Sequence, residues 1–266
     1  MIFRKTSLEK TGGVLFEYLS DDVTAKPAML VIPGGGYSVV CTEREGEPIA
    51  LAYLALGYNA FVLHYSVGRE ASGERPLAQA SEAVAYIRRN SKALSISEDM
   101  IFAVGFSAGG HLCGSLATMW KSENAVHAAG IKAGENRPDG VVLCYPVISG
   151  TEHPQKGSFV NLCGCENPTT RQLEYYSLER HVDKDSSPAF IIHTAEDELV
   201  PVENSLLMAQ AYAKAGVTFE LHVYPYGPHG LSLANHITSQ GKSELIDSQY
   251  ARWVNDSNIF LRSLKK

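Results

Sequence analysis

The chain has 266 residues, of which 45% are hydrophobic and 20% charged, and it carries a formal net charge of −6 at pH 7. This is the composition of an ordinary globular protein, and its acidic balance argues against a nucleic-acid binder, which would present a basic face. At this length a chain buries roughly 70–75% of its unfolded surface, so it needs no disulfide bonds to hold its fold.

Short runs of β-branched and aromatic residues alternate with longer helical patterns along the chain. We predict strands at Val14–Leu19, Ala28–Ile32, Ala60–Tyr65, Ile101–Gly105, Val141–Tyr145, Ala189–His193 and Phe219–Tyr224. We predict helices at Glu47–Leu56, Pro76–Asn90, Ala108–Trp120, Glu203–Ala215 and Glu244–Leu264. Most of the later strands are apolar throughout, as expected of strands covered on both faces. The alternation therefore predicts a single α/β domain, residues 1–266, with a mostly parallel central sheet and helices on both faces.

The stretch from Ile148 to Ser187 interrupts this alternation. It is rich in Gly, Pro, Asn and charged residues, and it is long for a connection between two elements. Long connections at the carboxyl ends of strands build the pockets of open α/β sheets. We therefore expect residues 148–187 to form a small cap-like insertion, with short helices, over the active site.

Ser107 lies in the segment VGFSAGG, after one predicted strand and before one predicted helix. That context is the one in which the Gly-x-Ser-x-Gly motif holds a nucleophilic serine on a strained turn. The flanking glycines, Gly105 and Gly109, give the helix room to approach the strand. A serine N-cap on a tight turn is the alternative, and the remaining motifs favour the nucleophile.

A serine hydroxyl needs a base and an acid beside it to become a nucleophile. Among nine histidines, His229 follows the last predicted strand in a Pro-His-Gly turn, at the same edge of the sheet as Ser107. His64 and His111 fall within a strand and a helix, where packing roles are expected. Asp197 follows the strand Ala189–His193 and is the predicted acid.

The neighbouring carboxylates leave alternatives for this acid. Glu196 and Glu198 flank Asp197 and are interpreted as solvated charges. If none of the three serves, Glu152, Glu166 and Asp183 in the 148–187 segment are the next candidates. The order serine, acid, histidine is that of the α/β-hydrolase fold and differs from the orders found in chymotrypsin and subtilisin.

Three glycines, Gly34 to Gly36, follow the strand Ala28–Ile32 in the segment LVIPGGGYS. Their spacing matches neither a dinucleotide-binding nor a phosphate-binding loop. Bare backbone N–H groups can instead approach the oxyanion of a tetrahedral intermediate. We predict an oxyanion hole made by Gly35, Gly36 and Ala108, with Tyr37 lining the substrate pocket.

This set of motifs resembles α/β-hydrolase esterases. The glycine run is similar to the His-Gly-Gly-Gly segment of hormone-sensitive-lipase-like esterases, but Pro33 replaces the histidine. Together with EREGEPIALAYLALGYNAFVLHYSV and GFSAGGHL, it is more similar to small bacterial acetyl esterases, the acetylxylan-esterase-like or xylanase-associated group. The resemblance covers nearly the whole chain and is weakest at Ile148–Ser187. It implies hydrolysis of short acyl esters, commonly acetyl groups on sugars.

The expected function is thus a Ser-His-Asp esterase that acts on a small-molecule ester, such as an acetylated oligosaccharide, and needs no cofactor or metal ion. A prolyl-oligopeptidase-like peptidase and a non-catalytic binding protein of the same fold are the alternatives. The former usually carries a large N-terminal domain, and the latter would be expected to lack one of the three residues.

The cysteines and the termini bear on location and assembly. Five cysteines make no disulfide framework, and Cys163-Gly-Cys165 lacks a second pair at zinc-site spacing. Neither a signal-peptide core nor a run of the ~20 apolar residues needed for a membrane span is found in the sequence. We expect a cytoplasmic protein with no membrane or nucleic-acid partner, and a homodimer remains one of the open oligomeric states.

Overall fold

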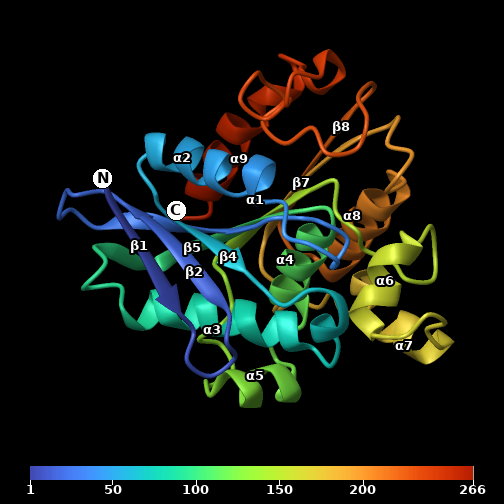
Figure 1. The fold of residues 1–266 in the computed structure, drawn as a ribbon, viewed down its shortest axis with the longest axis horizontal. Helices are drawn as coiled ribbons and strands as arrows, with labels where there is room; N and C mark the ends of the chain where they lie inside the picture. The colour runs from blue at the N-terminus through green and yellow to red at the C-terminus, as the bar shows by residue number, and fades with distance from the viewer. Residues whose placement is uncertain (266) are drawn as a thin grey trace.

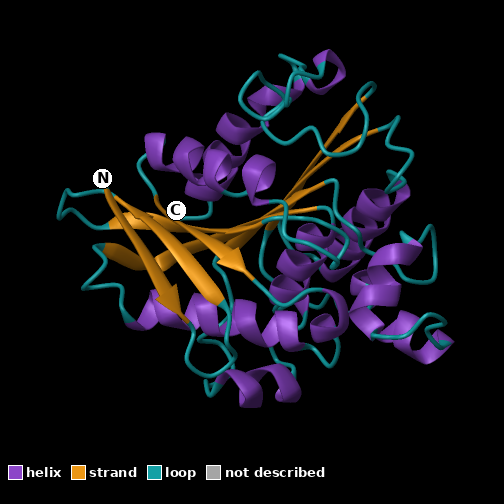
Figure 2. Cartoon of the chain, in the orientation of Figure 1, coloured by secondary structure: helices purple, strands orange, loops and turns teal. Residues whose placement is uncertain are grey.

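The computed structural model describes residues 1–265, and its centre is an eight-stranded sheet (Figures 1 and 2). The strands are β1 (Ile2–Ser7), β2 (Val14–Leu19), β3 (Lys26–Ile32), β4 (Asn59–His64), β5 (Ile96–Phe106), β6 (Gly140–Cys144), β7 (Ala189–Thr194) and β8 (Phe219–Tyr224). Their order across the sheet is β1-β2-β4-β3-β5-β6-β7-β8. The pairs β1/β2 and β2/β4 are antiparallel and all others are parallel, so the predicted mostly parallel sheet is confirmed.

Helices cover both faces of the sheet. They are α1 (Thr42–Glu45), α2 (Glu47–Ala55), α3 (Arg75–Arg89), α4 (Ala108–Thr118), α5 (Glu123–Ala129), α6 (Lys156–Cys163), α7 (Thr170–Tyr175), α8 (Glu203–Ala215) and α9 (Trp253–Ser263). In Figure 1, α2 and α9 lie on one side of the sheet, whereas α3 and α4 lie on the other. Alternate residues of the buried strand β3 divide accordingly. Leu30 and Ile32 join the core that includes Leu112 of α4, whereas Met29 and Val31 join the core that includes Trp253 of α9.

The chain leaves β3 in one direction across the sheet, toward β4, and later returns to place β5 on the other side of β3. Such a reversal opens a crevice at the carboxyl ends of the two strands, where ligands of open α/β sheets bind. The glycine loop follows β3 and Ser107 follows β5, so both lie at this crevice.

Two expectations for the ends of the chain were wrong. β1 was not predicted, because it is an edge strand whose residues are nearly all exposed, so it lacks an apolar pattern. The helix predicted at Glu244–Leu264 is α-helical only in α9. Two short 3₁₀ turns, η3 (Ser243–Leu245) and η4 (Tyr250–Arg252), precede it. The Asp247 carboxylate accepts the N–H groups of Gln249 and Tyr250, and this turn delays the helix.

The stretch between β6 and β7 folds into α6, α7 and a short 3₁₀ turn, η2 (Leu178–Arg180). These elements pack beside the carboxyl end of the sheet (Figure 1). The Asn161 side chain of α6 donates a hydrogen bond of 2.8 Å to the Gly36 carbonyl of the glycine loop. The role of residues 148–187 as a cap stays a prediction.

Candidate active site

Ser107 occupies a sharp turn between β5 and α4. Its φ of 54° and ψ of −119° lie outside the regions that non-glycine residues favour. A Cβ atom on Gly105 would lie 2.2 Å from the Gly109 carbonyl oxygen, and one on Gly109 would lie 2.2 Å from the Ile32 carbonyl oxygen. Glycine at both positions lets the helix pack directly on the strands, because a side chain at either one would clash with the backbone. The strained backbone presents the Ser107 hydroxyl at the carboxyl edge of the sheet.

His229 lies between Ser107 and Asp197. Its Nε2 atom is 2.9 Å from Ser107 Oγ, and its Nδ1 atom is 2.6 Å from Asp197 Oδ2. A carboxylate accepts hydrogen bonds but does not donate them, so Nδ1 carries the proton and donates to Asp197. That leaves Nε2 free to accept the Ser107 hydroxyl. The structure thus brings together the three residues that the sequence singled out, in the orientation that general-base chemistry requires.

The Asp197 carboxylate is buried and accepts hydrogen bonds from three N–H groups, with the His193 ring beside it. Oδ1 accepts the backbone N–H groups of Leu199 and Val200 at 3.0 and 2.9 Å. Oδ2 accepts His229 Nδ1 and lies 3.3 Å from His193 Nε2. Burial raises the pKa of this carboxyl. The contacts with His193 and His229, the charge of His229 and the Val200 N–H outweigh burial and hold the pKa well below its usual range. Asp197 therefore stays ionised at neutral pH.

The other candidate acids face elsewhere. Glu196 and Glu198 are exposed, and Glu196 accepts the Gly227 N–H at 3.3 Å. The candidates in the 148–187 segment, Glu152, Glu166 and Asp183, are exposed as well.

The glycine loop lies directly against Ser107. A Cβ atom on Gly34 would lie 3.0 Å from Ser107 Cβ, and the Gly34 N–H donates to Glu45 Oε2 at 2.8 Å. Within residues 1–265 no acceptor is found for the N–H groups of Gly35 and Gly36. The N–H of Ala108 is the first of α4, and helix geometry leaves it without an intrahelical acceptor. Three free donors therefore lie on the segments that flank Ser107.

Tyr37 differs from its expected placement as a pocket residue. Its side chain is only 1% exposed, and its hydroxyl lies 2.9 Å from His111 Nδ1. Its ring packs edge-on against Tyr65 and His111. Its backbone has a φ of 55°, and its ring joins the core that includes Leu112 of α4.

A hollow of about 810 Å³ lies beside the candidate triad. Its lining residues are Ala195, Glu196, Asp197, Glu198, Leu199, Pro228, His229 and Glu244. A volume of this size accommodates a small organic ligand.

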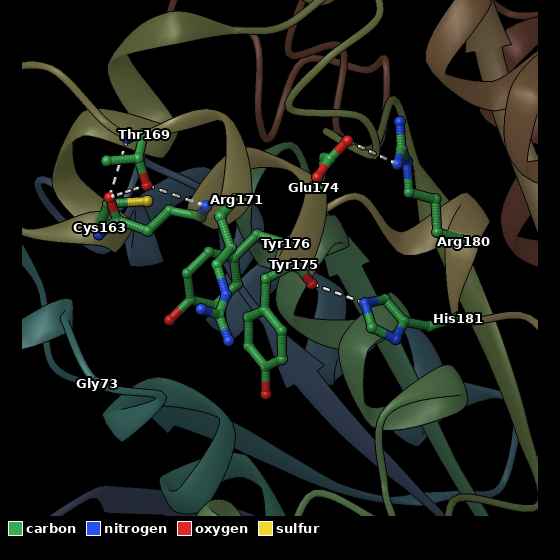
Figure 3. A pocket seen from close by; sticks show the side chains of 10 residues that line it. Gly73, Cys163, Thr169, Arg171, Glu174, Tyr175, Tyr176, Arg180 and His181 are labelled. Carbon is green, nitrogen blue, oxygen red and sulfur yellow. Dashed lines mark hydrogen bonds and ion pairs between the residues drawn. The ribbon is translucent and has the colours of Figure 1, made fainter.

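A second hollow, of about 580 Å³, lies on α7 and the neighbouring loops (Figure 3). Figure 3 shows Arg171, Tyr175 and Tyr176 directed into the same open space, whereas Arg180 pairs with Glu174 at 3.2 Å. This hollow shares no lining residue with the one beside His229. It belongs to the 148–187 segment and to Gly73, away from the candidate triad.

Three residues near the site were not anticipated: Glu45, Tyr145 and His193. His193 is fully buried, and its Nε2 donates to the Val200 carbonyl at 2.9 Å, while Nδ1 lies 2.7 Å from Ser205 Oγ. A histidine at the end of an apolar strand, four residues before the candidate acid, was a signal available in the sequence. Glu45 and Tyr145 gave no such signal, since each acts across the fold.

The buried His111, on the helix that follows Ser107, leads us to predict how stability depends on pH. Burial lowers the pKa of His111 to about 4. The unfolded chain takes up this proton near pH 6.5, so between these values it binds more protons than the folded state and stability falls as the pH drops. From pH 7.5 to pH 5 the free energy of unfolding should decrease by about 2 kcal/mol more in the wild type than in His111→Gln. Urea unfolding at both pH values measures this difference, and equal decreases in the two proteins would contradict it.

Comparison with known proteins places the chain in a family. A model of the BD-FAE family matches residues 18–212, well over half of the chain. The chain belongs to the BD-FAE family. The resemblance to acetylxylan-esterase-like proteins stated from the sequence is confirmed by curated relatives of this BD-FAE protein. An endo-1,4-beta-xylanase B of Butyrivibrio fibrisolvens is 42% identical over 83% of this chain and 35% of its own length. An acetylxylan esterase of Xylanibacter ruminicola is 32% identical over 76% of this chain and 40% of its own length.

Solved structures support the BD-FAE assignment and the α/β-hydrolase fold. An acetyl ester-xyloside bifunctional hydrolase from Caldicellulosiruptor lactoaceticus superposes with a TM-score of 0.82 and 36% identity, covering 95% of this chain and 88% of that one. The carboxylesterase Cest-2923 from Lactobacillus plantarum gives 0.84 and 26% identity, covering 99% and 98%.

Two further findings describe the extent of this BD-FAE chain. It spans about two fifths or less of the length of the two curated relatives above. Among the helices of residues 1–265, none combines the length and apolar character needed to cross a bilayer.

Proposed function

We propose that this chain is a carboxylic ester hydrolase that removes short acyl groups, acetyl above all, from carbohydrate esters by a Ser-His-Asp mechanism. The observation that carries the proposal is the hydrogen-bonded series Ser107 Oγ, His229 and Asp197 Oδ2, with contacts of 2.9 and 2.6 Å. The free N–H groups of Gly35, Gly36 and Ala108 beside it support the same chemistry.

In the first step, His229 Nε2 takes the hydroxyl proton of Ser107 while Oγ attacks the ester carbonyl carbon. The carbonyl oxygen becomes an oxyanion within reach of the backbone N–H groups of the glycine loop and of α4, which stabilise it. The imidazolium, stabilised by Asp197, returns the proton to the leaving alcohol. In the second step, His229 takes a proton from water while the water oxygen attacks the acyl-enzyme carbonyl. The bond between the acyl carbon and Ser107 Oγ then breaks, His229 returns the proton to Oγ, and the carboxylic acid leaves.

The substrate class rests on the relatives. The names of the xylanase, the acetylxylan esterase and the acetyl ester-xyloside hydrolase refer to xylan or to acetyl esters. For this chain, we take acetylated xylo-oligosaccharides as the substrates to test first. Release of acetate from them, measured beside turnover of p-nitrophenyl acetate and of a dipeptidyl anilide, separates the esterase from a peptidase and from a binding protein. Cleavage of the anilide alone would identify a peptidase, and no turnover at all a binding protein.

The length of the acyl chain provides a second test. If the acyl site is shaped for acetyl, the kcat/KM values for p-nitrophenyl esters should fall from acetate to butyrate and collapse by octanoate. A methylene that fits gains about 0.8 kcal/mol from burial, whereas one that overpacks the site costs about 1–3 kcal/mol. An optimum at eight carbons or more would contradict the acetyl preference.

A further inference from the structure

The motif EREGEP contains a carboxylate whose position was not explained by the sequence. Glu45, the last residue of α1, is 5% exposed. Its Oε2 accepts the Gly34 N–H at 2.8 Å, and its Oε1 accepts the Tyr145 hydroxyl at 2.8 Å. In residues 1–265 no Lys, Arg or His nitrogen lies within 4 Å of this carboxylate. A buried carboxylate without a cation relies on such hydrogen bonds, so Glu45 depends on these two donors.

Tyr145 extends this contact to the loop that carries His229. It directly follows β6, and its hydroxyl accepts the Ser232 N–H at 3.1 Å while it donates to Glu45. Its ring meets the His229 ring edge-on, with centroids 4.9 Å apart. The Tyr145 hydroxyl therefore connects Glu45 to the loop after His229 through two hydrogen bonds. The Tyr145 ring packs against the His229 ring and restricts its movement.

The neighbouring residue, Arg44, also forms hydrogen bonds with the residues that follow His229. Its guanidinium donates to the Gly230 carbonyl and, at 3.0 Å, to the Thr238 carbonyl. The Ser232 hydroxyl donates in turn to the Arg44 carbonyl. The four-residue helix α1 is thus bonded both to the glycine loop before it and to the residues that follow His229.

We infer that Glu45 is a positioning residue that holds the glycine loop and the His229 loop in register on either side of Ser107. The inference rests on the proposed function, because it concerns the spacing between the oxyanion donors and the general base. Each of the two groups works only within a few tenths of an ångström of its productive place. One carboxylate that accepts a donor from each side fixes that spacing.

Glu45→Gln tests this inference with almost no change in shape. If the glutamine oxygen keeps the Gly34 N–H, its NH₂ group donates to the Tyr145 hydroxyl, which then accepts from both this group and the Ser232 N–H and loses the acceptor for its own proton. We expect kcat for p-nitrophenyl acetate to fall about 10- to 100-fold with KM within about threefold. The affinity for a trifluoromethyl ketone, which mimics the oxyanion, should weaken in parallel with kcat/KM. Rates are expressed per site titrated with a fluorophosphonate, so that unfolded protein does not count.

Two further variants are measured beside Glu45→Gln, one as a control and one as a second test. Glu43→Gln changes an exposed carboxylate on the same helix and should leave kcat within about twofold. Tyr145→Phe keeps the ring against His229 and the Gly34 contact but removes the hydroxyl between Glu45 and Ser232, so kcat should fall at least fivefold at an unchanged KM.

The outcomes separate the inference from the proposed function. An active wild type with a folded Glu45→Gln protein of unchanged kcat and inhibitor affinity would overturn the inference alone. If Glu45→Gln does not fold, Tyr145→Phe decides, and an unchanged kcat in that variant would overturn it. A wild type without esterase turnover would overturn the proposed function and this inference together.

Discussion

Replacing Ser107 with alanine should abolish esterase turnover and covalent labelling by a fluorophosphonate while leaving the fold intact. In the proposed mechanism the Ser107 hydroxyl forms the acyl-enzyme, and His229 Nε2, 2.9 Å away, is the base that activates it. Loss of a triad serine leaves only the catalysis of the oxyanion hole and of binding, so kcat should drop on the order of 10⁵- to 10⁶-fold. Mass spectrometry of the labelled protein and initial rates with p-nitrophenyl acetate measure the two effects.

Ser115→Ala is the matched control for this change. Ser115 lies two turns further along the same helix, is buried, and donates only to the His111 carbonyl at 2.9 Å. Its alanine variant should keep labelling and turnover. Labelling that persists in Ser107→Ala would rule out Ser107 as the nucleophile.

Asp197→Asn should lower kcat by about 10³- to 10⁴-fold with little effect on the fold. The N–H groups of Leu199 and Val200 hold the Oδ1 position at 3.0 and 2.9 Å, so the amide oxygen of asparagine takes that place. Its NH₂ group then faces His229 Nδ1 and donates to it. The imidazole is driven to the tautomer with its proton on Nε2, which cannot accept the Ser107 proton.

Glu196→Gln and Glu198→Gln are the controls, since both side chains are exposed and neither contacts His229. Their kcat values should stay within about tenfold of the wild type, as expected for solvated charges worth about 0–1 kcal/mol. A large loss in either glutamine variant, with a small one in Asp197→Asn, would reassign the acid.

Local patterns predicted the central strands of the sheet well because these strands are buried on both faces. Runs such as Ala28–Ile32 and Val141–Tyr145 have no polar side. The glycine motif around Ser107 is visible in the local sequence, although only Gly105 is required by a local strand–helix contact and Gly109 lies against the distant Ile32 carbonyl. The same reasoning brought Asp197 and His229 to one edge, because parallel strands end together. The edge strand β1 and the turns before α9 lack these patterns, since exposed or side-chain-capped backbone carries no apolar period.

Contacts between distant segments were beyond the reach of local patterns. Glu45 meets Tyr145 across a sequence separation of 100 residues, and nothing near either residue marks the pair. The placement of Tyr37 was beyond the reach of local patterns for a related reason. Its position after the glycines predicted a ring in the substrate pocket, whereas its backbone conformation and the partner His111, 74 residues away, direct the ring into the core.

The order of strands has a stereochemical consequence. The glycine loop follows β3 on one side of Ser107, whereas Asp197 and His229 follow β7 and β8 on the other. An ester bound between them must direct its carbonyl oxygen toward β3 and its leaving alcohol toward β8. Oγ then meets the same prochiral face of every ester, and each tetrahedral intermediate forms with one handedness.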